Sequence, residues 1–362
     1  MRKSINDNPT IEVVVHSSLC TRCGVCEVVC PSGAIQLNGK FYPRVDWSKC
    51  NHCGLCREFC PGLSFDFQKY YQQMYAIDEP ILEPEGYYEK AYIAHSNDKK
   101  IRKMGSSGGL VTQVLVYLLR KKIVDGVVLV TDNEKDPTMP IPKIAFTEGE
   151  IIRGAGSKYS VVPVNKVLKQ VRKTHKKIAF VGTACHVHGL RRLQELDKKL
   201  LHNVKVVIGL ACSSTLESDA VNDILWRKGL AKSEVKQIRH RNGPFPGKLT
   251  ATLTHGTSVE LMKYPMCEFY GRLRLMYAPQ RCHLCPDYSA EFADISVADI
   301  MLRKSNGHYF YPDGRTVCLC RTDIGETLIK EMAREGAITV SPLPTYLVKK
   351  TFSKMKTIKK TL

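Results

Sequence analysis

The feature that most constrains this chain is a cysteine spacing that occurs twice within its first 61 residues. The two copies, each followed by a proline, are Cys20-x2-Cys23-x2-Cys26-x3-Cys30 and Cys50-x2-Cys53-x2-Cys56-x3-Cys60. Three thiolates on a tight loop can hold three corners of a 4Fe-4S cube, while the fourth thiolate of each copy binds the other cube. The spacing therefore predicts two clusters, one held by Cys20, Cys23, Cys26 and Cys60 and the other by Cys50, Cys53, Cys56 and Cys30.

Two other uses of cysteine fit this pattern poorly. A zinc site needs only four ligands and would not use a third cysteine and a Cys-Pro pair twice over. A disulfide framework needs an oxidising compartment, and the opening MRKSINDNPT has no apolar segment to direct export. Because no window approaches 18 uninterrupted apolar residues, we expect no direct membrane insertion. A cytoplasmic, oxygen-sensitive protein is expected.

The formal charge of +19 at pH 7 overstates the charge of a loaded protein. Four thiolates around a 4Fe-4S core leave about −2 per site, so three such sites would reduce the net charge to about +13. The chain has no helix-turn-helix, zinc-finger or aromatic-interleaved basic pattern, which argues against nucleic acid as a partner. An acidic redox partner, either a ferredoxin or subunits of a larger redox complex, fits better, although most of the lysines and arginines are expected to be simply solvated.

The pattern of the chain changes three times. The internal repeat of about 30 residues predicts a small α+β ferredoxin-like domain with two 4Fe-4S clusters over residues 1–66. Residues 67–90 are aromatic, acidic and broken by prolines, which predicts a wrapping linker. Alternating strands and helices over 91–345 predict an α/β domain with a mixed, largely parallel sheet. The basic tail over 346–362 carries Phe352, Met355 and Ile358, which could dock on a partner or lie on a frayed surface helix.

Hydrophobic periodicity places the elements of the α/β domain. The expected elements are strands at 91–95, 126–130, 177–182, 204–211, 293–300 and 316–322, a hairpin over 248–264, and helices over 110–122 and 323–336.

A second set of cysteines lies in the α/β domain. Cys282 and Cys285 form the only remaining pair with ligand spacing, while Cys185 and Cys212 each follow a predicted parallel strand. Because the carboxyl ends of such strands share one edge of the sheet, these four residues could converge on one site. The residues alone leave open a third cluster, a dithiol redox pair, a zinc knuckle or free buried thiols.

Two glycine-rich loops are candidate anion sites. Gly105 to Gly109, sequence GSSGG, directly precede an apolar-periodic helix, where backbone N–H groups can meet a phosphate, although an N-capping serine in a flexible turn explains the same pattern. In RGAGSKYS, residues 153–160, Lys158 and Tyr159 offer charge and stacking. Neither loop carries the Rossmann or P-loop fingerprint. The nearby His186, His188 and His283 are expected to be hydrogen-bonding neighbours of the cysteines rather than ligands.

SSGG, RGAGSKY, VGTACHVHGL, IGLAC, RHRNGPFPG and RCHLCPDYSAEFADISVADI occur in this order. This series resembles the family of coenzyme F420 hydrogenase/dehydrogenase beta subunits over roughly residues 10–340, and the ferredoxin segment in front is similar to the input subunit of F420H2 dehydrogenases. The resemblance implies a flavin-binding α/β fold, FAD near the two loops, a third 4Fe-4S cluster on Cys185, Cys212, Cys282 and Cys285, and coenzyme F420 as the substrate. It implies the following cofactor-binding residues: Ser106, Ser107, Gly108, Gly109, Thr112, Gly156, Ser157, Lys158 and Tyr159.

The function implied by the resemblance is that of an F420-dependent oxidoreductase. Hydride donors give two electrons, cubane clusters accept one, and a flavin can do both. Reduced F420 would pass a hydride to FAD, and single electrons would then cross the third cluster to the two ferredoxin-type clusters and a partner. Two alternatives remain: a ferredoxin-dependent flavoprotein reductase of another organic substrate, and a non-catalytic iron–sulfur electron-transfer subunit without flavin. The sequence does not identify catalytic acid or base residues, the electron acceptor or the direction of flow.

Overall fold

The computed structural model describes residues 10–353 and is built around an eight-stranded mixed sheet. Its strands are β3 (Lys90–Ser96), β4 (Gly126–Thr131), β5 (Ile141–Ala145), β6 (Ile178–Thr183), β7 (Val204–Leu210), β11 (Ile295–Asp299), β12 (Thr316–Cys320) and β13 (Ile338–Pro342). Their order is β13-β3-β12-β11-β7-β6-β4-β5. The central strands β11, β7, β6 and β4 pair in parallel, and the outer pairings are antiparallel. This confirms the predicted mixed α/β sheet.

Two strands of this sheet were not predicted from the sequence, and both lie at its edges. β5 contains Pro142 and β13 ends with Pro342. Proline has no N–H to donate to a neighbouring strand, so within sheets it occurs mainly in edge strands. The prolines therefore explain both why these strands were not predicted and why they lie at the edges.

Both faces of the sheet are buried. Successive strand residues point to opposite faces, so Val128 and Phe180 pack in one core and Val127 and Ala179 pack in another. The Val127 face is covered by α6 (Leu110–Arg120) and α14 (Asp323–Arg334), which match the predicted helices. The Val128 face is covered by α8 (Leu168–Val171) and α9 (Ala184–Leu196) together with the cysteine-rich segment.

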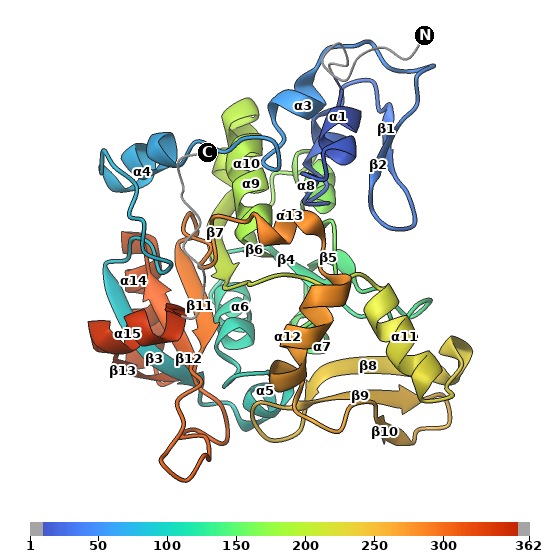
Figure 1. Cartoon of the computed structure of the whole chain (residues 1–362). Helices are drawn as coiled ribbons and strands as arrows, with labels where there is room; N and C mark the ends of the chain where they lie inside the picture. The colour runs from blue at the N-terminus through green and yellow to red at the C-terminus, as the bar shows by residue number, and fades with distance from the viewer. Residues whose placement is uncertain (1–9, 354–362) are drawn as a thin grey trace.

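A smaller antiparallel sheet lies at the opposite end of the molecule from the cysteine-rich segment (Figure 1). It consists of β8 (Val235–Asn242), β9 (Lys248–Leu253) and β10 (Ser258–Glu260), so the predicted hairpin over 248–264 gains a third strand. The other elements of the α/β region are α5 (Lys99–Met104), α7 (Glu148–Arg153), η2 (Val164–Val167), α10 (Lys198–Asn203), α11 (Asp219–Arg227), η3 (Lys232–Glu234), α12 (Met266–Tyr277) and α13 (Gln280–His283).

The cysteine-rich segment consists of short elements. These are α1 (Glu12–His16), α2 (Val25–Val29), β1 (Ile35–Leu37), β2 (Pro43–Val45) and α3 (Leu55–Glu58). Gly24 and Gly54, each directly after the second cysteine of its repeat, adopt φ values of 90° and 76° and let α2 and α3 begin there. The apolar core of the segment is continuous with that of the large sheet.

The residues expected to link these parts begin with a packed helix. In α4 (Phe67–Tyr75), Tyr70 and Tyr71 are buried, and the Asp66 side chain caps the first turn by accepting from the Lys69 N–H. Residues 67–90 are thus partly helical and anchored to the core.

For the basic tail, the expectation that Phe352 could dock on a partner is wrong. In α15 (Thr345–Phe352), Val348 and Phe352 are buried, and the Phe352 ring contacts Tyr288 edge-on. Phe352 is therefore a core residue and is unavailable to a partner, whereas Met355 and Ile358 lie outside the described residues. Within residues 10–353, no helix has both the length and the apolar character needed to span a bilayer.

Candidate functional site

The second cysteine set converges at the carboxyl edge of the parallel strands. Cys185 lies in the first turn of α9, just after β6, and Cys212 lies two residues beyond β7. Cys282 is in α13 and Cys285 follows it. All four line one cavity. Cys185 and Cys212 meet there because they follow neighbouring parallel strands, whose carboxyl ends share one edge of the sheet.

The chemistry of this cavity fits a cationic metal cluster. Burial raises the pKa of the Cys212 thiol well above its ordinary value, and the nearby Cys282, Cys185 and Cys285 raise it further. Burial, followed by the charge of Asp287, raises the pKa of Cys285 to about 12. Thiolates gathered in a buried site therefore need a bound cation to neutralise them. No three described His, Cys, Asp or Glu side chains converge on a single metal ion, and a cubane does not require this because each of its thiolates binds a different iron.

Seven of the first eight cysteines gather in two groups. Burial raises the pKa of Cys26, and Cys23, Cys20 and Cys60 add to that rise. Burial also raises the pKa of Cys56, to which Cys30 and Cys53 contribute. Each group therefore includes a cysteine of the other repeat, Cys60 in the first and Cys30 in the second. Cys50 belongs by spacing to the second group, whose Cys53 is exposed.

The three cysteine sets lie one after another. Cys185 of the cavity is close enough to Cys23 for its pKa to be affected, and Cys26 is similarly close to Cys56. Thr21, from the loop between Cys20 and Cys23, lines the cavity itself. The buried first group thus lies between the cavity and the second group, of which only Cys53 is exposed.

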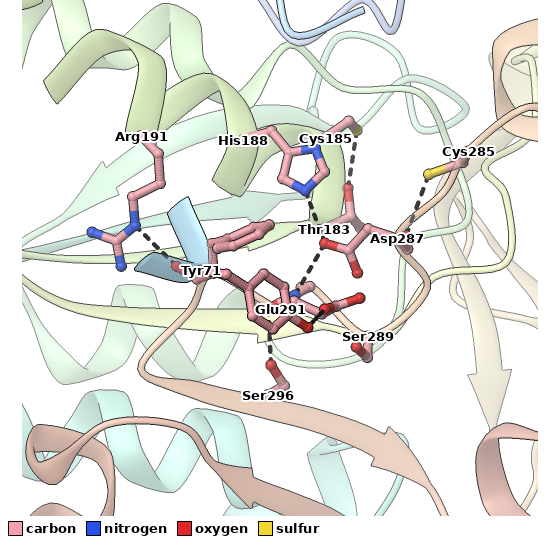
Figure 2. Close-up of polar contacts among 12 residues, drawn as sticks. Tyr71, Thr183, Cys185, His188, Arg191, Cys285, Asp287, Ser289, Glu291 and Ser296 are labelled. Carbon is pink, nitrogen blue, oxygen red and sulfur yellow. Dashed lines mark hydrogen bonds and ion pairs between the residues drawn. The ribbon is translucent and has the colours of Figure 1, made fainter. Parts of the chain in front are cut away.

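A buried polar network supports one wall of the cavity. His188 Nε2 lies 2.8 Å from Asp287 Oδ2, and the His188 ring stacks on Phe65 with centroids 3.9 Å apart. Figure 2 shows the His188 ring directed at the Asp287 carboxylate, with Cys185 and Cys285 beside the pair. The Asp287 carboxylate also accepts from the Glu291 N–H at 3.0 Å, and Glu291 accepts from the Tyr71 hydroxyl of α4.

His186 and His188 line the cavity, but their hydrogen bonds go to residues other than cysteine. His186 Nε2 lies 2.9 Å from Val162 O, and Thr183 N donates to His186 Nδ1 at 3.2 Å. His188 is paired with Asp287, whereas His283 is exposed and does not line the cavity. Sequence reasoning missed Asp287, because the CPDYSAE segment gives no sign of a partner on α9.

The two glycine-rich loops meet. Ser157 N donates to Ser106 Oγ at 2.7 Å. Gly108 and Gly109 adopt φ values of 79° and 72°, and α6 begins after Gly109. Ser107 instead turns to the sheet, where its hydroxyl donates to Arg315 O at 2.6 Å.

A pocket lies between the second loop and β8. It is lined by Met104, Asp132, Arg153, Ala155, Gly156, Ser157, Lys158, Gln237, Ile238, Arg239, His240 and Arg241. Lys158 Nζ turns back to its own loop and donates to Gly154 O at 3.0 Å. His240 Nδ1 is buried without a hydrogen-bond partner among the described residues. The cationic lining and this orphaned nitrogen fit an anionic ligand.

The remaining predicted cofactor residues do not line this pocket. Tyr159 packs against His240 and Tyr270, with ring centroids 5.6 Å and 4.9 Å away. Thr112 is buried within α6. The cations on β8, Arg239 and Arg241, were not singled out from the sequence as site residues, although the RHRNG segment contains both.

Family models match most of the described chain. Residues 91–169 and 175–345 match the N-terminal and C-terminal models of the coenzyme F420 hydrogenase/dehydrogenase beta subunit. Residues 13–36 and 43–63 match the 4Fe-4S binding domain.

Individual relatives agree with these matches. The chain is 30% identical to the coenzyme F420 hydrogenase subunit beta of Methanococcus voltae over 70% of its own length and 85% of the relative. It is 27% identical to a subunit of the F(420)H(2) dehydrogenase of Methanosarcina mazei over 93% of its own length and 88% of the relative.

The fold has a counterpart among solved structures. A chain of the xenon-derivatized F420-reducing [NiFe] hydrogenase complex from Methanosarcina barkeri superposes with a TM-score of 0.59. The match covers 77% of this chain and 91% of that chain at 22% identity, and it shows that the two chains share a fold. The ordered motifs, the family models and the sequence relatives all agree with this fold. This chain therefore belongs to the family of coenzyme F420 hydrogenase/dehydrogenase beta subunits and carries a 4Fe-4S binding domain ahead of the family domains.

Proposed function

We propose that this protein is an iron–sulfur flavoprotein oxidoreductase that passes electrons between coenzyme F420 and a redox partner. The observation that carries the proposal is the succession of three cysteine sets, in which Cys185 lies near Cys23 and Cys26 lies near Cys56. An FAD, when bound, supplies the exchange between two-electron hydride chemistry and one-electron transfer.

Twelve cysteines would hold three 4Fe-4S clusters. The outer set would be Cys30, Cys50, Cys53 and Cys56, the middle set Cys20, Cys23, Cys26 and Cys60, and the inner set Cys185, Cys212, Cys282 and Cys285. Cys53 is exposed, so a partner would approach the outer set. The basic surface of the chain favours an acidic partner, such as a ferredoxin or a subunit of a larger redox complex.

The glycine-rich loops would bind the anionic parts of FAD and F420. Ser106 and Ser157 hold the two loops together, and Lys158 fixes the second loop through its carbonyl groups. Arg239 Nη2 donates to Met104 O at 3.0 Å and keeps the first loop beside the pocket. Ser107, Gly108, Gly109 and Thr112 would act less directly, by fixing the entry into α6.

The two domains predicted from the sequence would then have different tasks. Residues 1–66 would carry electrons to or from the partner, and residues 91–345 would bind FAD and F420. Residues 67–90 would anchor one part to the other through α4, since the Tyr71 hydroxyl donates to Glu291 beside the cavity wall.

Anaerobic turnover tests this function. Purified holoprotein should oxidise F420H2 with a one-electron viologen acceptor, and NADH should not replace F420H2. A flavin-containing protein that accepts electrons from reduced ferredoxin but not from F420H2 would instead be a ferredoxin-dependent reductase. A protein with clusters and no flavin would be an electron-transfer subunit.

A further inference from the structure

Two polar side chains beside Cys23 are unexplained by packing alone. Among the nitrogen and oxygen atoms of the described residues, Thr21 Oγ1 has no hydrogen-bond partner, and neither do Asn165 Nδ2 and Oδ1. The Asn165 side chain is completely buried, with 0% of its surface exposed. Buried polar groups in folded proteins nearly always have a partner, so these two residues require one.

Close backbone packing holds Asn165 in place. Its N–H donates to Cys23 O at 2.9 Å, which ties η2 to the first cysteine loop. On the other side lies α9, where a Cβ added at Gly189 would come within 2.2 Å of Asn165 Nδ2. Only glycine at position 189 leaves room for the amide between α9 and the cysteine loop.

Cys23 is the neighbour that the two side chains share. Thr21 lies two residues before Cys23 in the same loop, the Asn165 N–H is bound to the Cys23 carbonyl, and both side chains lie close to the Cys23 sulfur. A cluster bound through this sulfur would supply the acceptor that the two donors lack. Thr21 also lines the cavity that contains Cys185, so the two donors lie where the middle and inner cysteine sets approach each other.

We propose that Thr21 and Asn165 donate hydrogen bonds to the Cys23 sulfur and thereby raise the reduction potential of the middle cluster. This rests on the proposed function, which supplies the clusters. Hydrogen bonds to ligand sulfurs stabilise the more negative, reduced cluster. One electron would arrive from the inner 4Fe-4S cluster, with no proton transfer or covalent bond change. Thr21 and Asn165 are positioning residues that favour electron flow from the inner set to the middle set.

Thr21→Val and Asn165→Leu test the inference, because each removes a donor while retaining a similar side-chain shape. EPR-monitored redox titration of anaerobic holoprotein should show that one midpoint potential falls and the other two stay in place. The expected fall is on the order of 59 mV, the one-electron equivalent of a tenfold change in the reduction equilibrium.

Asn203→Leu is the matched control. Its amide donates to Thr174 O at 2.9 Å and Val171 O at 3.4 Å, both backbone carbonyls. Removing this structural amide should lower stability and move no midpoint potential.

The outcomes separate the inference from the function on which it rests. Unchanged midpoints in Thr21→Val and Asn165→Leu, with full iron content, would overturn the inference and leave the function intact. If Asn165→Leu fails to assemble, the nearly isosteric Thr21→Val decides, together with pulsed EPR of wild-type protein labelled with side-chain 15N-asparagine. Coupling of that nitrogen to a reduced cluster is expected, and its absence would remove Asn165 from the proposal. Wild-type protein without cubane iron would overturn the function itself.

Discussion

At the scale of residues, each cysteine of the inner set reaches the cavity from its own point in the chain. Cys185 and Cys212 follow neighbouring strands, whereas Cys282 lies in α13 and Cys285 just after it, about 70 residues later in the sequence. Their convergence could be expected because parallel strands bring their carboxyl ends to one edge. The His188–Asp287 pair could not be expected, because its members are 99 residues apart and neither belongs to a spacing motif.

Cys212→Ser tests the inner set. A serine hydroxyl replaces thiolate poorly, so the variant should lose about four of about twelve iron atoms per chain, since each cubane holds four. Iron analysis of anaerobically purified protein measures this loss. Cys318→Ala is the control, because Cys318 is fully buried in β12, and it should keep its iron. Full iron in Cys212→Ser would remove Cys212 from the ligands.

His240 predicts a defined acid sensitivity. Burial, and then the charge of Lys158, lowers the pKa of His240 from 6.5 to about 4. Because the folded protein holds the neutral ring, this stabilisation is complete above about pH 6.5 and is lost as the pH falls toward 4. The contribution lost between pH 7 and pH 5 should be up to roughly 2 kcal/mol.

Urea unfolding of holoprotein at both pH values measures this contribution. His240→Asn should lose less stability between pH 7 and pH 5 than wild type does. His255→Asn, at an exposed position, should keep the wild-type difference. An equal loss in His240→Asn and wild type would show that His240 is not held neutral.

At the scale of elements, an ion pair with a buried arginine joins the cysteine-rich segment to the α/β domain. Arg22 Nη1 and Nη2 donate to the Glu217 carboxylate at 2.7 Å and 2.6 Å, and the Arg22 side chain is 1% exposed. A second pair between the same parts, Lys40–Asp219 at 2.9 Å, is exposed. The two ion pairs therefore differ in how far they are shielded from water, a difference that the sequence alone does not show.

Glu217→Gln should destabilise the holoprotein by about 3–5 kcal/mol, because it leaves the buried Arg22 charge unpaired. Asp219→Asn should cost about 0–1 kcal/mol, because exposed pairs are screened by water. Anaerobic urea unfolding compares the two variants. Equal effects would mean that the Arg22 contact is as solvent-screened as the exposed one.

The success of element prediction also depends on burial. β6 and β7 are nearly continuous apolar runs, typical of strands buried on both faces, and both were predicted. β8 carries charged residues among its buried positions and was missed. α12 was missed because its apolar residues are spread around the helix, with Leu275 and Met276 exposed. In this chain, hydrophobic patterns predicted β6 and β7, which face the core, and did not predict β8 and α12, which partly face a pocket or solvent.

At the scale of the whole molecule, the pocket beside β8 is far from the cysteine-rich segment but close to the inner cysteine set. Tyr159, next to Lys158 of the pocket, contacts Tyr270, whose pKa is raised by burial and then by the nearby Cys212. The cysteine-rich segment lies beside α8, α9 and α13, and the pocket next to β8 lies toward the other end (Figure 1). The inner cysteine set lies at the edge of the central sheet, on the side where the segment packs. In the proposed function, electrons would pass to a partner through the cysteine-rich segment, and the pocket would hold the anionic cofactor.

The most direct test is one anaerobic preparation in which iron, flavin and reduction by F420H2 are measured together. About twelve iron atoms, as expected for three cubanes, and one flavin per chain are expected, and F420H2 should bleach the cluster absorbance. About eight iron atoms without flavin would contradict the three-cluster flavoprotein and leave a ferredoxin-like conduit. Flavin that does not respond to F420H2 would contradict the choice of substrate.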